Sequence, residues 1–156
     1  MGYTHFFTQL RPVTNEEWTA LTTDVGRILT RVQGDGTLLA YEYNEPHLPP
    51  SITPNLIRFN GVEDDGLETF YLARESEMNV RGQPGYRCQF CKTGQKPYDS
   101  AVCAVLLAMH RNAPGAWDIS SDGEIDDEGW QQAILLYAMT CEVPMEESEK
   151  VPWLIE

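Results

Sequence analysis

The sequence predicts an α+β domain, with a mixed or mainly antiparallel sheet of about five strands and three helices packed mainly on one face. Three observations predict this class. Strands and helices do not alternate in a strict βαβ repeat, two short β-type runs flank a polar turn, and three stretches have helical periodicity. A chain of 156 residues with 42% hydrophobic content fits one core. We therefore expect a single domain over residues 1–141, followed by an acidic C-terminal extension over residues 142–156.

The N-terminal part predicts one strand and one helix. Residues 3–8 alternate between two faces, as in a strand. Thr14 to Glu17 have capping-box spacing, and six apolar residues then recur at intervals of three and four: Trp18, Leu21, Val25, Ile28, Leu29 and Val32. Residues 34–36 end this helix. The Pro-rich stretch that runs on to Pro54 is expected to be a long connection with one short strand near residues 38–43.

The middle of the chain predicts a hairpin, a strand and a central helix. The runs 55–60 and 67–73 are separated by a polar, glycine-bounded turn, so we expect them to pair. Residues 86–91 form a further strand after the turn-rich residues 81–85. Pro97 suits a first helical turn, and residues 98–111 form a helix that is apolar nearly all round. Such a helix should lie at the centre of the fold.

The C-terminal part predicts a strand at residues 116–120, a turn at 121–124 and a third, amphipathic helix. The apolar residues of this helix are Trp130, Ala133, Ile134, Tyr137, Ala138 and Cys141. From Glu142 onward the chain is acidic and is interrupted by Pro144 and Pro152. We therefore expect the extension to be weakly packed, although its apolar residues would also allow it to dock.

Charge is distributed unevenly. The net charge is −13, and residues 118–156 contain eleven acidic residues and one lysine, whereas residues 76–117 contain five basic and two acidic residues. A net negative surface repels phosphate backbones, so we expect no direct binding of nucleic acid. No apolar run approaches the length of a membrane span, and the first residues lack the pattern of a signal peptide. We expect a cytoplasmic protein without a membrane partner.

The four cysteines predict neither a metal centre nor a cofactor. Cys88 and Cys91 have the two-residue gap of a zinc knuckle, but no second pair of ligands follows. Cys103 and Cys141 fall within apolar helical patterns. We therefore expect free thiols, no metal and no cofactor.

Five short strings occur in order along the chain: Gly2-Tyr-Thr-His5, Phe59-Asn-Gly61, Glu68-Thr-Phe70, Phe90-Cys-Lys-Thr93 with Lys96-Pro-Tyr-Asp99, and Ser120-Ser-Asp-Gly123. In these strings the chain resembles a group of small proteins from phages, prophages and bacteria, over roughly residues 2–141. The resemblance implies a phage protein that acts in the host cytoplasm. Because no activity is established for the group, it supplies candidate residues and no mechanism.

The candidates favour an anion-binding site between residues 90 and 99. Lys92 and Lys96 are four residues apart, and a helix N-terminus follows them. We expect a ligand site made by His5, Asn60, Glu68, Lys92, Thr93, Lys96, Tyr98, Asp99 and Asp122. The spacing of a phosphate-binding P-loop is absent, which argues against a nucleoside triphosphatase. The alternative is that both lysines are solvated and that Asp99 only caps the helix.

Individual residues of this set leave further alternatives open. His5 is interpreted either as a general base or as a hydrogen-bonded core histidine, and Ser120, Ser121 and Asp122 belong to the same set of candidates. Glu68 is either a catalytic carboxylate or the partner of Arg58 across a hairpin. No G-x-S-x-G or H-E-x-x-H motif appears, which lowers the expectation of a hydrolase.

Three classes of function follow, in order of preference. The first is a phage-encoded binding protein that sequesters an anionic small ligand, such as a nucleotide signal, as a counter-defence factor. The second is an acidic, DNA-mimic-like inhibitor of a host defence or nucleic-acid-binding protein. The third is an enzyme acting on a phosphorylated small molecule through His5, Glu68 and Asp122. The expected partner is a small anionic ligand or a host protein, and the oligomeric state is left open.

Overall fold

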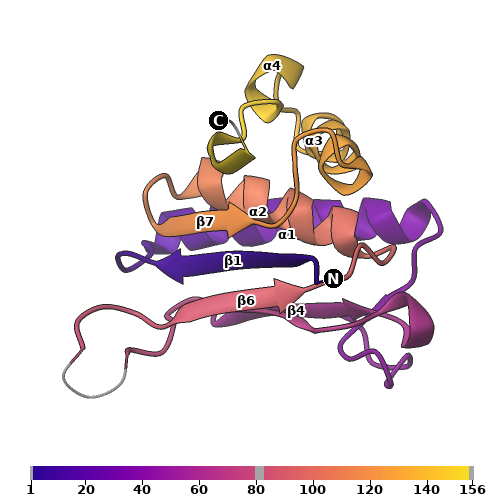
Figure 1. The fold of residues 1–156 in the computed structure, drawn as a ribbon, viewed down its shortest axis with the longest axis horizontal. Helices are drawn as coiled ribbons and strands as arrows, with labels where there is room; N and C mark the ends of the chain where they lie inside the picture. The colour runs from indigo at the N-terminus through magenta and orange to yellow at the C-terminus, as the bar shows by residue number, and fades with distance from the viewer. Residues whose placement is uncertain (1, 80–82, 155–156) are drawn as a thin grey trace.

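The computed structural model describes residues 2–79 and 83–154, and its seven strands form two antiparallel sheets (Figure 1). In the first sheet, β1 (Thr4–Gln9) lies between β6 (Cys88–Lys92) and β7 (Trp117–Ser121). In the second, β4 (Leu56–Gly61) pairs with β2 (Leu39–Ala40), β3 (Ser51–Ile52) and β5 (Phe70–Ala73). The α+β class and the hairpin are confirmed, with seven described strands in two sheets where about five were expected. The turn predicted at 81–85 lies partly outside the described residues.

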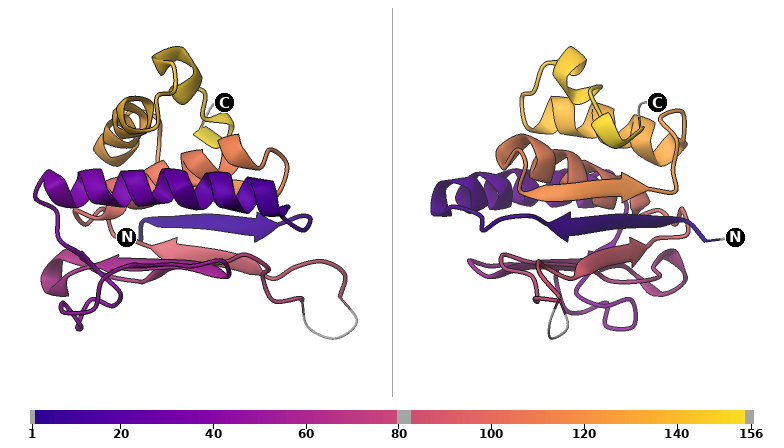
Figure 2. Two further views of the ribbon diagram at one scale, coloured as in Figure 1. Left: turned by 180° about the vertical axis from the view of Figure 1, so that it is seen from behind. Right: turned by 60° about the vertical axis from the view of Figure 1, so that its left-hand side comes forward.

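The helices are α1 (Asn15–Gly34), α2 (Asp99–Asn112), α3 (Glu128–Thr140) and the short α4 (Met145–Ser148). Two 3₁₀ turns, η1 (Glu63–Asp65) and η2 (Pro152–Leu154), complete the described elements. Seen from behind, α1 lies in front of α2 and above β1, and α3 packs on α2 (Figure 2). Within residues 2–79 and 83–154, no helix has both the length and the apolar character needed to cross a bilayer.

The sequence signals explain why the two main helices form where they do. Thr14 Oγ1 accepts a hydrogen bond from the backbone N–H of Glu17, and Glu17 Oε1 accepts one from the N–H of Thr14, so the predicted capping box is present. Helix α2 is buried along almost its whole length, from Asp99 to Met109. It is the central helix that its all-round apolar pattern predicts.

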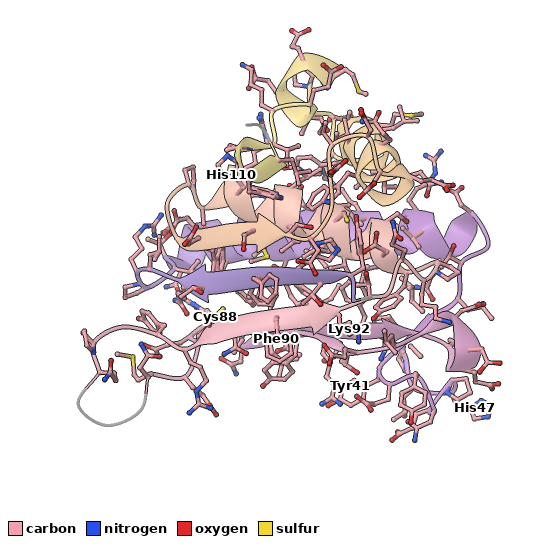
Figure 3. The ribbon with its side chains drawn as sticks, viewed as in Figure 1. Tyr41, His47, Cys88, Phe90, Lys92 and His110 are labelled. Carbon is pink, nitrogen blue, oxygen red and sulfur yellow. The ribbon has the colours of Figure 1, made fainter. Side chains whose placement is uncertain are left out.

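Strand alternation separates neighbouring residues onto two faces of the first sheet. His5 and Phe7 of β1 are buried on the face that the helices cover. Cys88, Phe90 and Lys92 of β6 are exposed on the opposite face, where Figure 3 labels them. Because successive strand residues point to opposite faces, the register decides which polar residues can meet beneath the helices.

The C-terminal segment packs on the domain as far as Leu154, which corrects the expectation of weak packing. Val151 is fully buried, and Ser148 Oγ donates a hydrogen bond of 2.6 Å to the carbonyl of Ile134. The Trp153 ring lies edge-on to Trp130 at a centroid distance of 5.7 Å. The prolines end a continuous helix, but the short turns that remain place these residues against the core.

Candidate functional site

His5 lies at the centre of a polar network that joins three elements of the fold. Its side chain is fully buried, with Nδ1 2.8 Å from Ser121 Oγ and Nε2 2.7 Å from Asp99 Oδ1. Asp99 is only 3% exposed, and Ser121 is half-buried. The three side chains come from β1, α2 and β7, so residues 94 and 116 positions away in sequence bond to the same imidazole.

The pairing of β1 with β7 explains why His5 and Ser121 meet. Asp122 donates its backbone N–H to the carbonyl of Thr4, so the next pair along the ladder, His5 with Ser121, is of the non-hydrogen-bonded kind. Side chains approach most closely in such a pair. The same alternation directs the backbone N–H of Ser121 away from β1, towards the outer edge of β7. Figure 1 shows the C-terminal segment beyond that edge.

The first turn of α2 fixes the orientation of the imidazole. Asp99 Oδ1 accepts a hydrogen bond of 2.5 Å from Thr93 Oγ1, and Oδ2 accepts a weaker one of 3.7 Å from the thiol of Cys103. The positive end of the helix dipole also favours a carboxylate at this position. A carboxylate that accepts from His5 Nε2–H leaves Nδ1 as the acceptor for the Ser121 hydroxyl. The hydrogen-bond network therefore assigns the tautomer.

Ser121 connects this buried network to an open cleft. The cleft has a volume of about 650 Å³ and is lined by Ser121, Gly123, Glu124, Ile125, Asp126, Trp153 and Leu154. Among these lining residues two are acidic and none is basic. The backbone N–H of Gly123 donates a hydrogen bond of 2.9 Å to Ser121 Oγ. The hydroxyl therefore accepts from Gly123 while donating to His5, an arrangement that polarises its O–H bond.

Of the nine predicted site residues, the network brings together His5, Thr93 and Asp99. Three others hold the loop before β5 in place. Asn60 is fully buried and bonds to the carbonyl and the N–H of Leu67. Tyr98 donates its hydroxyl to the carbonyl of Glu68, whose carboxylate accepts the backbone N–H of Lys92. The polar groups of these three side chains therefore form hydrogen bonds within the protein. The predicted pairing of Glu68 with Arg58 does not occur, since Arg58 forms an ion pair with Glu42.

Lys92, Lys96 and Asp122 lie in three different parts of the structure, and none of them hydrogen-bonds to His5. Lys92 is exposed on the outer face of β6, opposite to the face of His5. Lys96 lines a different cavity, of about 320 Å³, together with Asp99 and Glu128. Asp122 is exposed and accepts the backbone N–H of Thr4. The expected convergence of both lysines with His5 on one pocket does not occur, because Lys92 belongs to the strand and not to the loop after it.

Cys103 is a functional candidate that the sequence did not suggest. Its Sγ lies 3.7 Å from His5 Nε2, and the ligand atoms of His5, Asp99 and Cys103 all lie within 4.8 Å of one another. Burial, helped by the nearby Asp99 carboxylate, raises the pKa of the Cys103 thiol well above its ordinary value. The spacing of Asp99 and Cys103, four residues apart on one helix, indicates from sequence that their side chains lie on the same face. No sequence pattern indicates that His5 lies beside them.

No protein-family model, no curated protein and no solved structure matches this chain. The resemblance to a phage group therefore stays a prediction.

Proposed function

We propose that the chain is a serine-dependent acyl hydrolase, with Ser121 as the nucleophile, His5 as the general base and Asp99 as the residue that positions His5. One observation carries the proposal. The hydroxyl of a serine that lines an open cleft bonds to a fully buried histidine, whose second ring nitrogen is held by a buried carboxylate. Nucleophile, base and orienting acid in this mutual contact are the parts that an acyl-transfer site requires.

The proposed reaction has two steps. Ser121 Oγ attacks the carbonyl carbon of an ester, and its proton moves to His5 Nδ1. The C–O bond to the leaving group then breaks, and the leaving oxygen takes the proton from Nδ1. Water attacks the acyl-enzyme in the second step, gives its proton to Nδ1, and the proton returns to Ser121 as the acid is released. Asp99 accepts Nε2–H throughout and stabilises the imidazolium that forms in each step.

The backbone offers a group to stabilise the developing oxyanion. The strand register directs the N–H of Ser121 towards the outer edge of β7, on the side of η2. A nucleophile's own N–H is well placed to bond the oxygen of the carbonyl that it attacks. Ser121 thus supplies both the attacking oxygen and one oxyanion donor.

The lining of the cleft points to the class of acyl substrate. Glu124 and Asp126 give it a negative rim, and Ile125, Trp153 and Leu154 give it an apolar wall. Negative charge around a cleft raises the local concentration of cations and lowers that of anions. We expect neutral or cationic esters with an apolar group to react faster than anionic ones.

A fluorophosphonate probe followed by intact-mass measurement and peptide mapping tests this proposal. The wild-type chain should gain one probe per molecule at Ser121, and Ser121→Ala should gain none. Ser120→Ala is the matched control, since Ser120 is the neighbouring strand residue on the outer face, and it should label like wild type. An unlabelled wild-type protein, or equal labelling of Ser121→Ala, would sink the proposal. A loss of ester hydrolysis of about 10³-fold or more is expected for Ser121→Ala.

The functions predicted from sequence stay predictions. For an anionic ligand, the supporting observation is that Lys96 lines a cavity at the start of α2, although Asp99 and Glu128 line it too. For an acidic interaction surface, the supporting observation is that Glu124 and Asp126 line the Ser121 cleft. Of the residues predicted for an enzyme on phosphorylated substrates, His5 belongs to the network, and Glu68 and Asp122 do not contact it.

A further inference from the structure

Three side chains of types that can bind a metal ion converge at His5, and the hydrolase proposal uses only two of them. His5, Asp99 and Cys103 are each buried, and each offers one ligand atom to a common centre. We infer that this cluster is a binding site for a zinc-type transition metal ion, held by His5 Nε2, an Asp99 oxygen and Cys103 Sγ.

The two sulfur distances suit tetrahedral zinc. Zn–S bonds of about 2.3 Å with Zn–N and Zn–O bonds of about 2.0 to 2.2 Å place sulfur about 3.5 Å from nitrogen or oxygen, and nitrogen about 3.3 Å from oxygen. In the structure, Cys103 Sγ is 3.7 Å from His5 Nε2 and 3.7 Å from Asp99 Oδ2. His5 Nε2 lies 2.7 Å from Asp99 Oδ1, the other oxygen of the same carboxylate, and this is the length of the hydrogen bond that a metal ion would replace.

The charges also suit a divalent ion. A thiolate, a carboxylate and a neutral imidazole around a dication sum to zero net charge, so the occupied site would bury no unbalanced charge. The raised pKa of the Cys103 thiol is no barrier in principle, because a coordinating metal ion takes the place of the thiol proton. The mixture of thiolate and imidazole ligands favours zinc or cobalt over magnesium or calcium.

Groups around the cluster complete the site. Ser121 Oγ faces His5 Nδ1 at 2.8 Å and would accept the N–H that metal-bound histidine usually donates. Thr93 Oγ1 bonds to the Asp99 carboxylate and fixes its orientation. The cavity beside Lys96 is lined by Asp99 and Gly129, so one of the three ligand residues borders it. The sequence predicted no metal because the cysteines lacked partners; the fold brings the partners from β1 and the start of α2.

Metal binding would oppose the proposed hydrolase, and this consequence rests on that proposal. An ion on Nε2 leaves the ring proton on Nδ1, so the imidazole then donates to Ser121 Oγ and is unable to take its proton. Zinc should therefore inhibit fluorophosphonate labelling of Ser121, while chelation should restore it.

Titration of the metal-free, reduced chain with Co²⁺ tests the site without any activity measurement. We expect one equivalent to bind, with the strong visible absorption of four-coordinate Co²⁺ and a near-ultraviolet thiolate-to-cobalt band, and one equivalent of Zn²⁺ should displace it. Cys103→Ser should lose the thiolate band. A variant with serine at Cys88, Cys91 and Cys141 should keep it, and this variant decides the assignment even if Cys103→Ser does not fold. Ser121→Ala should bind the metal about 10-fold more weakly or worse, through loss of the contact to Nδ1.

Three results would overturn the inference: no thiolate band in the wild-type chain with excess Co²⁺, a band that persists in Cys103→Ser, or loss of the band in the variant with serine at Cys88, Cys91 and Cys141. None of these results bears on the hydrolase, since fluorophosphonate labelling in the presence of a chelator measures Ser121 without metal. Conversely, a chain that binds Co²⁺ through Cys103 but never labels keeps the metal site and loses the hydrolase.

Discussion

The two faces of the first sheet differ in what their polar residues do, although the residues alternate along the same strands. On the inner face, His5 and Ser121 bond to each other beneath the helices. On the outer face, Lys92 and Ser120 are exposed to solvent. The adjacent serines of β7, Ser120 and Ser121, thus lie in different environments, because strand residues alternate between the two sides of the sheet. Position on the pleat, more than residue type, therefore selects the residues that can take part in chemistry.

Burial also changes how much free energy a polar contact contributes to stability. On the inner face the hydrogen bonds that join His5 to Asp99 and to Ser121 lie in a region of low dielectric constant, where they are strong and where breaking one leaves a partner unsatisfied. On the outer face water replaces any lost contact. Substitutions of matched chemistry on the two faces should therefore differ by orders of magnitude in reactivity and by several kcal/mol in stability.

Asp99→Asn should have the largest effect. The amide presents a different hydrogen-bonding pattern to His5 Nε2 and disturbs the tautomer that accepts the Ser121 proton, so fluorophosphonate labelling should slow by about 10⁴-fold. Asp122→Asn is the control, because Asp122 is exposed and its carboxylate accepts the backbone N–H of Thr4. Labelling time courses measure both. Similar rates for Asp99→Asn and wild type would mean that the contact is structural and not catalytic.

Removal of residues 142–156 should have the next largest effect, and here the structure reverses the expectation from sequence. Val151 is fully buried, and Trp153 packs on Trp130, which itself lies edge-on to His5 at 5.5 Å. Losing this burial should cost on the order of 5 kcal/mol and lower the melting temperature by about 10 to 20 °C. Circular dichroism melting measures the change.

Met145→Ala is the control for that truncation, because Met145 is 41% exposed and lies in the same segment. It should melt within about 2 °C of wild type. A truncated chain that melted like Met145→Ala would restore the view of the segment as an appendage.

The sequence predicted the elements well because their signals are local. The capping box of Thr14 and Glu17 and the apolar pattern of α2 depend on neighbours in the chain, and both appear where expected. The hairpin of β4 and β5 follows from two runs around one turn. Packing of the C-terminal segment was missed, because proline at 144 and 152 argues against a long helix but says nothing about contacts with Trp130.

The candidate site was predicted only in part for a related reason. His5, Thr93 and Asp99 were selected, but their connection to Ser121 and Cys103 depends on the register of β1 with β7 and on the placement of α2. Lys92 was selected as a loop residue, but it is the last residue of strand β6. An error of one residue in a strand boundary decides whether a side chain is free in a loop or directed to one face by the pleat, so site predictions fail before element predictions do.

Gly129→Ala should have a moderate effect that tests how closely the inner-face network is packed. A β-carbon at Gly129 would clash with the Asp99 carboxylate, so α3 or Asp99 must move, at a cost of about 1 to 3 kcal/mol. Gly26→Ala is the matched control on α1, where the new methyl group meets no atom within 4 Å and should stabilise the helix by about 0.5 to 1 kcal/mol. Urea denaturation of both variants measures the difference. Opposite signs are expected, and equal effects would contradict the packing of α3 on Asp99.

Phe90→Thr should have the smallest effect of these substitutions on the free energy of unfolding. Phe90 is 59% exposed on the outer face of β6, and threonine keeps the preference for a strand, so unfolding free energy should change by no more than about 0.5 kcal/mol. Phe7→Thr makes the same exchange on the inner face, where Phe7 is 1% exposed, and should cost about 3 to 5 kcal/mol. Denaturation curves for the pair, with Ser121 labelling as a second readout, measure both. A large loss of stability in Phe90→Thr would show that the outer face is covered in solution, and the contrast between the faces would then need a partner to explain it.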